Sequence, residues 1–357
     1  MSKKILLGAI CTVLFCGTSA TVFAQDNAPS GAASSLLNSA DPRAAGMGMA
    51  TTAVNDNPFG IFGNAASNLL SEKRMGFGYS YNPVMPDYNK GVATHAVGGY
   101  FNLDENNGFS LGFRYFNGPK SIIAGDDAVA GDSFRPNDYF NGPKSIIAGD
   151  DAVAGDSFRP NDMAVSIGYT RRIVDNFTMS LTARYIRSDY TKFGSDYYKA
   201  GNAFTFDLGF YYENTIESFY GSTWAVGLNV SNVGTKLDIS VLSTPIAMPA
   251  YAKLGGSIDM PFSENHKLLA ALDLGYTFMP STDASFTAGL GLEYNFLKHG
   301  FLRAGYHYGD EKSIGGSYAT VGLGAAVGPV RVDASYWIAG KESPVKNTWA
   351  VGLSLFF

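Results

Sequence analysis

The chain ends in Trp349-Ala350-Val351-Gly352-Leu353-Ser354-Leu355-Phe356-Phe357, where large apolar side chains alternate with small ones and the last residue is aromatic. Successive side chains of a β-strand point to opposite faces. One face of this segment is therefore apolar, and the other holds mainly Ala, Gly and Ser. That division suits a wall with lipid outside and a polar lumen inside. An amphipathic edge strand of a soluble sheet would show the same alternation.

The same alternation recurs in segments of about ten residues, the length that a tilted strand needs to cross a membrane. The segment 91–101 fits less well, because His95 and the pair Gly98-Gly99 interrupt it. The regular segments are 75–81, 109–115, 165–169, 177–181, 204–210, 224–230, 254–260, 268–276, 286–294, 302–308, 321–327 and 330–336.

The connections between these segments fall into two classes. Short polar turns at 104–107, 174–176, 263–266, 297–300 and 328–329 alternate with longer stretches rich in Gly, Pro, Asp and Ser. Short periplasmic turns and long external loops alternate in this way in outer-membrane barrels. Counting back from Phe357 predicts an all-β fold, an antiparallel transmembrane barrel of about 14 strands that begins near Arg74. A soluble β-sandwich or propeller is the alternative, but it would not need two classes of loop.

Composition agrees with a barrel. Aromatic residues make up 14% of the chain, charged residues 16%, and there are 42 glycines, while the mean hydropathy is -0.01. After residue 24, no run approaches the roughly 18 apolar residues of a membrane helix. A chain that spans a bilayer must then do so as a closed barrel, the other fold that pairs every backbone group in lipid. The net charge of -5 argues against a nucleic-acid partner.

The first 24 residues predict a secretory signal peptide. Two lysines precede an apolar run at 5–15, and small residues precede Gln25, where we expect the mature chain to begin. Both cysteines, Cys11 and Cys16, fall in the removed segment. The mature chain would then contain no disulfide and no lipid anchor.

Residues 25–73 remain before the predicted barrel of residues 74–357. They begin with a small, polar linker and continue with stretches rich in Gly, Ala and Asn. Because this segment cannot form a long strand ladder of its own, we predict that it forms a hatch or plug inside or beneath the barrel. The alternative is a disordered periplasmic tail.

The segment Asp41-Pro42-Arg43-Ala44-Ala45-Gly46-Met47-Gly48-Met49-Ala50, followed by Asn57-Pro58-Phe59 and Asn64-Ala65-Ala66, resembles the N-terminal region of PorV/PorQ outer-membrane proteins of Bacteroidetes. That group is similar to the wider class of the fatty-acid transporter FadL, which implies 14 strands and an N-terminal hatch. The chain end resembles the C-terminal assembly signal of outer-membrane barrels in Gly352, Leu355 and Phe357. The resemblance assigns the hatch motif to Asp41, Arg43, Gly46, Gly48, Asn57 and Asn64.

This resemblance implies a non-enzymatic component of type IX protein secretion or surface attachment. The expected partners are secreted cargo proteins or secretion-machine subunits, outer-membrane lipid and the barrel assembly machinery. The expected location is the Gram-negative outer membrane after signal-peptide export. Two alternatives stay open: a FadL-like transporter of hydrophobic small molecules, and a structural surface barrel whose loops carry the function.

The predicted inner face of the wall carries charges of both signs. A lumen of this kind favours water, internal ion pairs and a plug held by polar contacts over a continuous apolar tunnel. For each charge, a contact within the wall or to the plug is favoured over a transport role. The predicted lumen-facing charges are Arg114, Arg184, Asp207, Asp273, Glu293, Arg303, Arg331 and Asp333.

Residues 115–138 are repeated without change as residues 139–162. Because old structural repeats drift, this identity indicates a recent duplication or an assembly error. The repeat falls almost wholly in one external loop, whose lengthening costs little closure entropy. Its aspartates favour a solvated acidic loop over a calcium site. We expect a protein partner at the external loops 117–162 and 189–202.

The sequence predicts no enzyme, cofactor or metal site. Its four histidines are scattered, and no Ser, His and acid set stands at a telling spacing. The motifs Gly289-x-Gly291 and Gly322-x-Gly324 fall within strand alternation, so they are interpreted as small lumen-facing residues rather than phosphate loops.

Overall fold

The computed structural model describes residues 34–357, except for 85, 87–90, 119–120, 125–145, 148–156, 159–160, 190–198, 218–220, 240–244, 282–283, 311–312, 314 and 342. The predicted signal peptide lies outside the described residues. So do most of the duplicated segment 115–162 and most of the loop 189–202.

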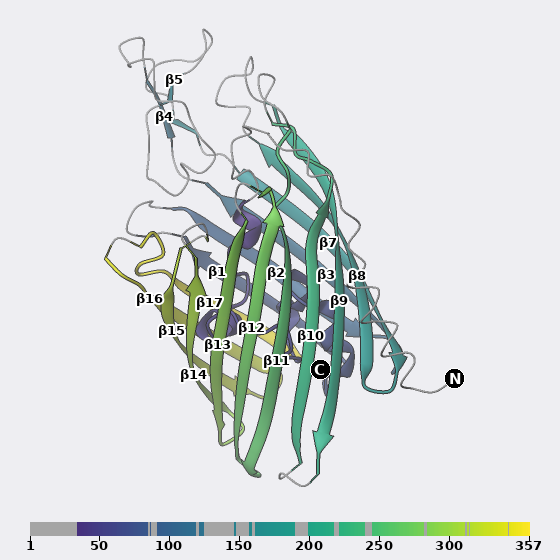
Figure 1. Cartoon of the computed structure of the whole chain (residues 1–357). Coiled ribbons are helices and arrows are strands. Elements are labelled where there is room, and N and C mark those ends of the chain that lie inside the picture. The colour runs from purple at the N-terminus through teal and green to yellow at the C-terminus, as the bar shows by residue number, and fades with distance from the viewer. Residues whose placement is uncertain are drawn as a thin grey trace.

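Fourteen antiparallel strands form one closed barrel, as predicted (Figure 1). Each strand pairs with its neighbours along the chain, and the first strand pairs with the last. The strands are β1 (Met75–Pro83), β2 (Ala93–Asn102), β3 (Asn107–Asn117), β7 (Asn161–Val174), β8 (Phe177–Asp189), β9 (Gly201–Ile216), β10 (Ser222–Gly234), β11 (Ala250–Ser263), β12 (His266–Met279), β13 (Ser285–Phe296), β14 (Gly300–Gly309), β15 (Tyr318–Val327), β16 (Val330–Ile338) and β17 (Trp349–Phe356).

Three short strands form a separate small sheet within the duplicated segment. These are β4 (Ser121–Ala124), β5 (Ile146–Ile147) and β6 (Ser157–Phe158), with β4 in the middle. Figure 1 shows β4 and β5 beyond one end of the barrel. The duplication therefore lies between β3 and β7, which pair directly in the wall.

The end of the chain closes the barrel. β17 pairs with β1 in the register Tyr79↔Leu353. The Met75 backbone N–H donates to the Phe357 carbonyl at 3.0 Å, and the Phe357 N–H donates to the Met75 carbonyl at 2.9 Å. Closure removes the unpaired strand edge that would be costly in lipid, because each backbone group at the seam finds a partner.

Alternate side chains of each strand face outward, and most of them are apolar. Leu111 is 62% exposed and Leu323 is 61% exposed, and both lie in the middle of their strands. Tyrosines near the ends of the wall bond to polar neighbours, as Tyr169 does to Asn107 and Tyr336 does to Asn347. An apolar band bounded by aromatic residues is the surface that a bilayer covers.

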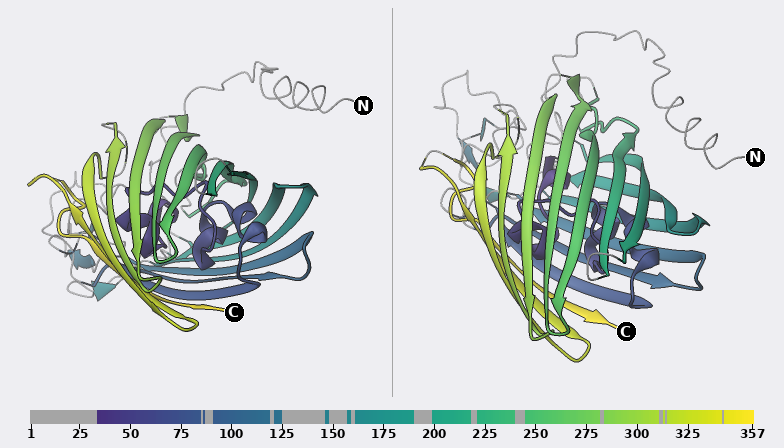
Figure 2. Two further views of the ribbon diagram at one scale, coloured as in Figure 1. Left: turned by 90° about the horizontal axis from the view of Figure 1, so that it is seen from below. Right: turned by 60° about the horizontal axis from the view of Figure 1, so that its bottom comes forward.

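The N-terminal segment, residues 34–73, contains four short helices inside the ring of strands (Figure 2). They are η1 (Ser34–Leu37), α2 (Pro42–Gly46), η2 (Pro58–Phe62) and η3 (Ala65–Leu70). Asp41, Asn57 and Asn64 cap the last three, each accepting a hydrogen bond from a backbone N–H two residues later. None of the helices in the described ranges has the length and apolar character needed to cross a bilayer.

A charge on the outward face tests the lipid-facing surface. We expect Leu323→Arg to lower the free energy of unfolding in lipid vesicles by about 2–4 kcal/mol, because a mid-wall arginine loses its hydration. Val327→Arg is the matched control, since Val327 ends β15 beside the turn at Gly328. It should cost roughly 0–1 kcal/mol. Denaturant titration measures both, and equal costs would contradict the assigned membrane band.

Candidate functional site

A chain of ion pairs joins the N-terminal segment to the barrel wall. Arg43 in α2 contacts Glu293 of β13 through two nitrogens, Nη2 to Oε1 at 2.7 Å and Nε to Oε2 at 2.9 Å. Glu293 also accepts from Arg303 Nε of β14 at 2.5 Å. Arg303 contacts Asp333 of β16 at 2.8 Å, and Arg331 contacts the same carboxylate at 2.9 Å. Five buried charged residues thus form a continuous chain from α2 to β13, β14 and β16.

Arg43 is positioned by its own helix. Its backbone N–H donates to Asp41 Oδ1 at 2.8 Å, and its Nη1 donates to the Asn55 carbonyl at 3.0 Å. Burial favours a neutral Arg43, but the adjacent Glu293 outweighs it and raises the pKa of Arg43 above its usual value. The guanidinium therefore stays charged, and the bidentate pair stays intact.

At Asp41, burial outweighs the contacts that favour the ionised carboxylate. Burial raises the pKa of this carboxyl above its usual value, although hydrogen bonds from Asn57 Nδ2 at 2.6 Å and from the Arg43 N–H favour the ionised form. The contact between Asp41 and Asn57 links two of the helix caps to each other. Asp41 thus contacts both of the other predicted hatch-motif residues, Arg43 and Asn57.

The remaining predicted lumen charges bind elsewhere along the N-terminal segment or within the wall. Asp273 of β12 accepts from the backbone N–H of Thr51 and of Thr52, and from Thr52 Oγ1 at 2.6 Å. Arg114 of β3 donates to the Leu36 carbonyl at 2.6 Å. Arg184 pairs with Asp207 at 2.7 Å and also contacts Asn232. All eight predicted lumen-facing charges are buried on the inner side of the wall.

Inward hydroxyls of the wall complete the contacts to the backbone of the N-terminal segment. Ser80 Oγ donates to the Ala40 carbonyl at 2.6 Å, and Thr178 Oγ1 donates to the Ala66 carbonyl at 2.7 Å. Ser257 Oγ donates to the Ala53 carbonyl at 2.7 Å. These residues were not predicted as site residues, although they lie on the small-residue face of their strands. Buried backbone groups need such partners, because an unpaired one costs about 1–3 kcal/mol.

Predicted hatch residue Asn64 also bridges the segment and the wall. Its Nδ2 donates to the Thr52 carbonyl and to the Phe210 carbonyl of β9, both at 2.9 Å. A Cβ placed on Gly209 or Gly227 would collide with atoms of Asn64. Asn64 therefore occupies space that exists because those two wall residues lack side chains.

Glycines that face the N-terminal segment recur around the whole barrel, and we call them the glycine belt. A Cβ on Gly291 would lie 2.5 Å from the Met47 carbonyl oxygen, and one on Gly98 would lie 2.5 Å from the Pro58 carbonyl oxygen. Gly305 and Gly289 meet the backbone of Gly48, whose own φ of +61° favours glycine. The belt consists of Gly78, Gly98, Gly112, Gly168, Gly209, Gly227, Gly255, Gly289, Gly291, Gly305, Gly322 and Gly352.

Two further predicted site residues, Gly46 and Gly352, also meet the other side of the interface at this belt. Gly46 of α2 lies against Gly322, where a Cβ on either residue would be 3.1 Å from the Cα of the other. Gly352, from the predicted assembly signal, faces Pro42 of α2. Leu355 pairs with Phe77 of β1, and Phe357 makes the seam bonds described above.

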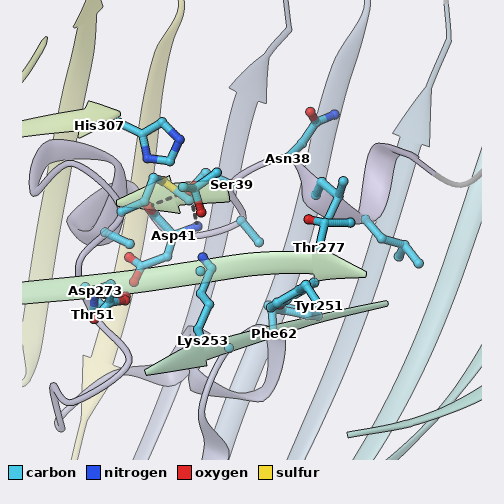
Figure 3. A pocket seen from close by; sticks show the side chains of 18 of the residues that line it. Asn38, Ser39, Asp41, Thr51, Phe62, Tyr251, Lys253, Asp273, Thr277 and His307 are labelled. Carbon is cyan, nitrogen blue, oxygen red and sulfur yellow. Dashed lines mark hydrogen bonds between the residues drawn. The ribbon is translucent and has the colours of Figure 1, made fainter. Parts of the chain in front are cut away.

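A cavity of about 560 Å³ lies between the N-terminal segment and the wall (Figure 3). Its lining combines hydroxyl, amide and charged side chains with aromatic and aliphatic ones. Tyr251, Lys253 and Thr277 come from the wall, while Asn38, Ser39 and Phe62 come from the N-terminal segment. Among the described residues, no group of three or more His, Cys, Asp or Glu side chains could hold a metal ion.

Matched alanine substitutions test the glycine belt. Gly305→Ala should destabilise the barrel by about 1–3 kcal/mol through overpacking, because its Cβ would meet the backbone of Met47 and Gly48. Gly256→Ala, whose Cβ would come no closer than 3.9 Å to any atom, should be neutral or slightly stabilising. Denaturant titration and trypsin cleavage after Arg43 measure both effects. Equal behaviour of the two variants would contradict the close approach.

Known proteins share the barrel fold of this chain, as the following matches show. No protein of curated function matches the sequence. The toluene transporter TbuX of Ralstonia pickettii is 13% identical, with a TM-score of 0.52 over 89% of this chain and 98% of that chain. The toluene transporter TodX of Pseudomonas putida is 12% identical, with a TM-score of 0.55 over 90% and 98%. At these identities the likeness shows the barrel fold alone.

A family model shows more than the fold. The model described as "Type IX secretion system protein PorV" matches residues 22–284. This range covers most of the chain, including the N-terminal segment and the strands β1 to β12. The predicted resemblance is thereby confirmed, and the protein belongs to the PorV family of type IX secretion system outer-membrane barrels.

Proposed function

We propose that this PorV-family barrel serves type IX secretion as a sealed, non-enzymatic barrel in which residues 34–73 form a fixed hatch. The observation that carries the proposal is the bidentate contact of Arg43 with Glu293, set within the glycine belt. A buried ion pair that loses one partner leaves an uncompensated charge, at a cost of about 3–5 kcal/mol. Displacing the hatch would separate this pair and break the surrounding hydrogen bonds at the same time.

In this proposal, residues 1–24 direct export and are removed, and residues 25–33 link the new N-terminus to the hatch. The barrel assembly machinery would recognise the chain end at Gly352, Leu355 and Phe357. Outer-membrane lipid would cover the apolar outward face, whose exposed side chains include Leu111 and Leu323.

Because the proposed lumen is sealed, other proteins would contact the barrel at its outer surfaces. Secreted cargo proteins and secretion-machine subunits are the partners that the PorV family implies. We propose that they meet the barrel at its external loops, 117–162 and 189–202. The exposed acidic side chains predicted for the doubled loop would favour a partner surface of opposite charge.

Transport of a small hydrophobic molecule is the second candidate. It is favoured by the fold, which is shared with proteins described as toluene transporters. The buried charges around Arg303 count against a continuous apolar route through the barrel, because a hydrocarbon cannot replace their polar partners. A transported molecule would have to avoid this part of the lumen.

Single-channel recording tests the seal. The wild-type barrel in a planar bilayer should show no steady conductance, whereas Arg43→Gln should open in bursts because the hatch loses its ion pair with the wall. Lys73→Gln is the matched control, since Lys73 is exposed and makes no ion pair with another described residue.

Heat-modified migration on gels confirms that each variant is a folded barrel. Steady conductance of the wild type, or closed behaviour of a folded Arg43→Gln variant, would contradict the proposed hatch.

A further inference from the structure

The inner wall carries a polar patch on three neighbouring strands that the hatch does not use. Tyr251 of β11 is opposite Thr277 of β12, which is opposite Ser285 of β13. In the next row, Lys253 is opposite Gly275, which is opposite Thr287. All six residues line the cavity between the N-terminal segment and the wall. Five polar side chains therefore surround one position that has no side chain.

The side chains of Thr287 and Lys253 close over Gly275 at the centre of this patch. A Cβ there would lie 2.5 Å from Thr287 Oγ1 and 3.4 Å from Lys253 Cγ. The hydroxyls of Thr277, Ser285 and Thr287 make no hydrogen bond to another described residue, so they remain available as donors. Figure 3 shows Lys253 and Thr277 directed into the cavity.

Among the described residues, Lys253 has no carboxylate partner. No Asp or Glu in the described part of the chain lies within 4.0 Å of its ammonium group, which instead lies 5.5 Å from the centre of the Tyr251 ring. Partly buried charges are normally paired. Thr277 and Thr287 can each donate one hydrogen bond beside it.

The other charges around the cavity are already engaged. Asp273 lies close enough to Lys253 to feel its charge, but its oxygens accept hydrogen bonds from Thr51 and Thr52. Asp41 is bonded to Asn57, and Arg114 donates to the Leu36 carbonyl. The His307 ring is stacked on Tyr318, with the ring centroids 4.8 Å apart. The nearby carboxylates therefore serve the N-terminal segment, and the ammonium group of Lys253 keeps its capacity for an anion.

We propose that Lys253, Thr277 and Thr287 form an anion subsite at the cavity wall, where they hold the carboxylate of a small molecule bound in the cavity. A carboxylate accepts several hydrogen bonds and is attracted by the ammonium group, so it matches one cation surrounded by hydroxyl donors. The cavity volume of about 560 Å³ suits a small molecule rather than a folded protein segment.

The body of the acid has two possible sources, because the lining offers both kinds of contact. Asn38 and Ser39 suit a hydroxylated acid, while Phe62 and Met279 suit an aliphatic acid. Galacturonate represents the first source and hexanoate the second. Both share the carboxylate, and neutral galactose and hexanol lack it.

Isothermal titration of the purified full-length barrel in detergent tests the site with these four probes. At least one of the two acids should bind about tenfold or more tightly than its neutral counterpart, and the acid that binds identifies the source. Lys253→Gln should weaken that acid about tenfold, the loss expected for one charged hydrogen bond.

Lys267→Gln is the matched control, since Lys267 is on the same strand as Gly275 but pairs with Asp259 at the exposed end. It should bind the acid as the wild type does. Thr287→Val is the second variant, in case Lys253→Gln fails the heat-modification test for folding, and it should weaken binding severalfold. Binding of neither acid, or unchanged binding by a folded Lys253→Gln variant, would overturn the subsite.

Discussion

The close approach of the N-terminal segment to the barrel wall is the constraint on which the other features of the interior depend. Main-chain atoms of residues 47, 48 and 58 occupy positions where a Cβ from the wall would otherwise stand. Twelve wall glycines make this room, and they come from eleven of the fourteen strands. The wall and the segment are therefore complementary in shape, and neither packs well without the other.

The buried charges follow from that approach. A carboxylate such as Glu293 would be costly on an inner wall deprived of water, but Arg43 and Arg303 reach it from two sides. Asp273 is similarly satisfied by the backbone of Thr51 and Thr52. Because the partners on the N-terminal segment are fixed by its helix caps, the ion pairs specify one position for the segment in addition to any stability that they supply.

Much of the fold could be predicted from the sequence, because period-two alternation reports directly which face of a strand meets lipid. The least regular segment, 91–101, still forms β2 (Ala93–Asn102). Its irregularity has a physical cause: outward-facing His95 bonds to the Tyr79 hydroxyl, and inward-facing Gly98 accommodates the Pro58 carbonyl. Local deviations from the pattern thus mark contacts with other parts of the chain.

The interior contacts were less predictable. The sequence indicated which side of the wall Glu293 and Arg303 occupy, but the pairing of Glu293 with Arg43 spans 250 positions and depends on how the N-terminal segment folds back. Similarly, the 42 glycines were apparent as a composition. Their role as a belt depends on which atom of the N-terminal segment each glycine faces, and composition does not specify this. Lys253, whose anion site we propose, carried no local signal at all.

In the proposed function, the lumen of this type IX secretion barrel stays closed by its own N-terminal segment. The most direct test replaces the Arg43–Glu293 ion pair with a reversible covalent link, in which a short bis-methanethiosulfonate reagent bridges Arg43→Cys and Glu293→Cys. Secretion of type IX cargo is measured in cells that carry only the folded double variant, with the link intact and after reductant has cleaved it. Equal secretion in the linked and cleaved states agrees with a permanently seated hatch. Secretion that stops on linking and returns on reduction would show that the hatch must move.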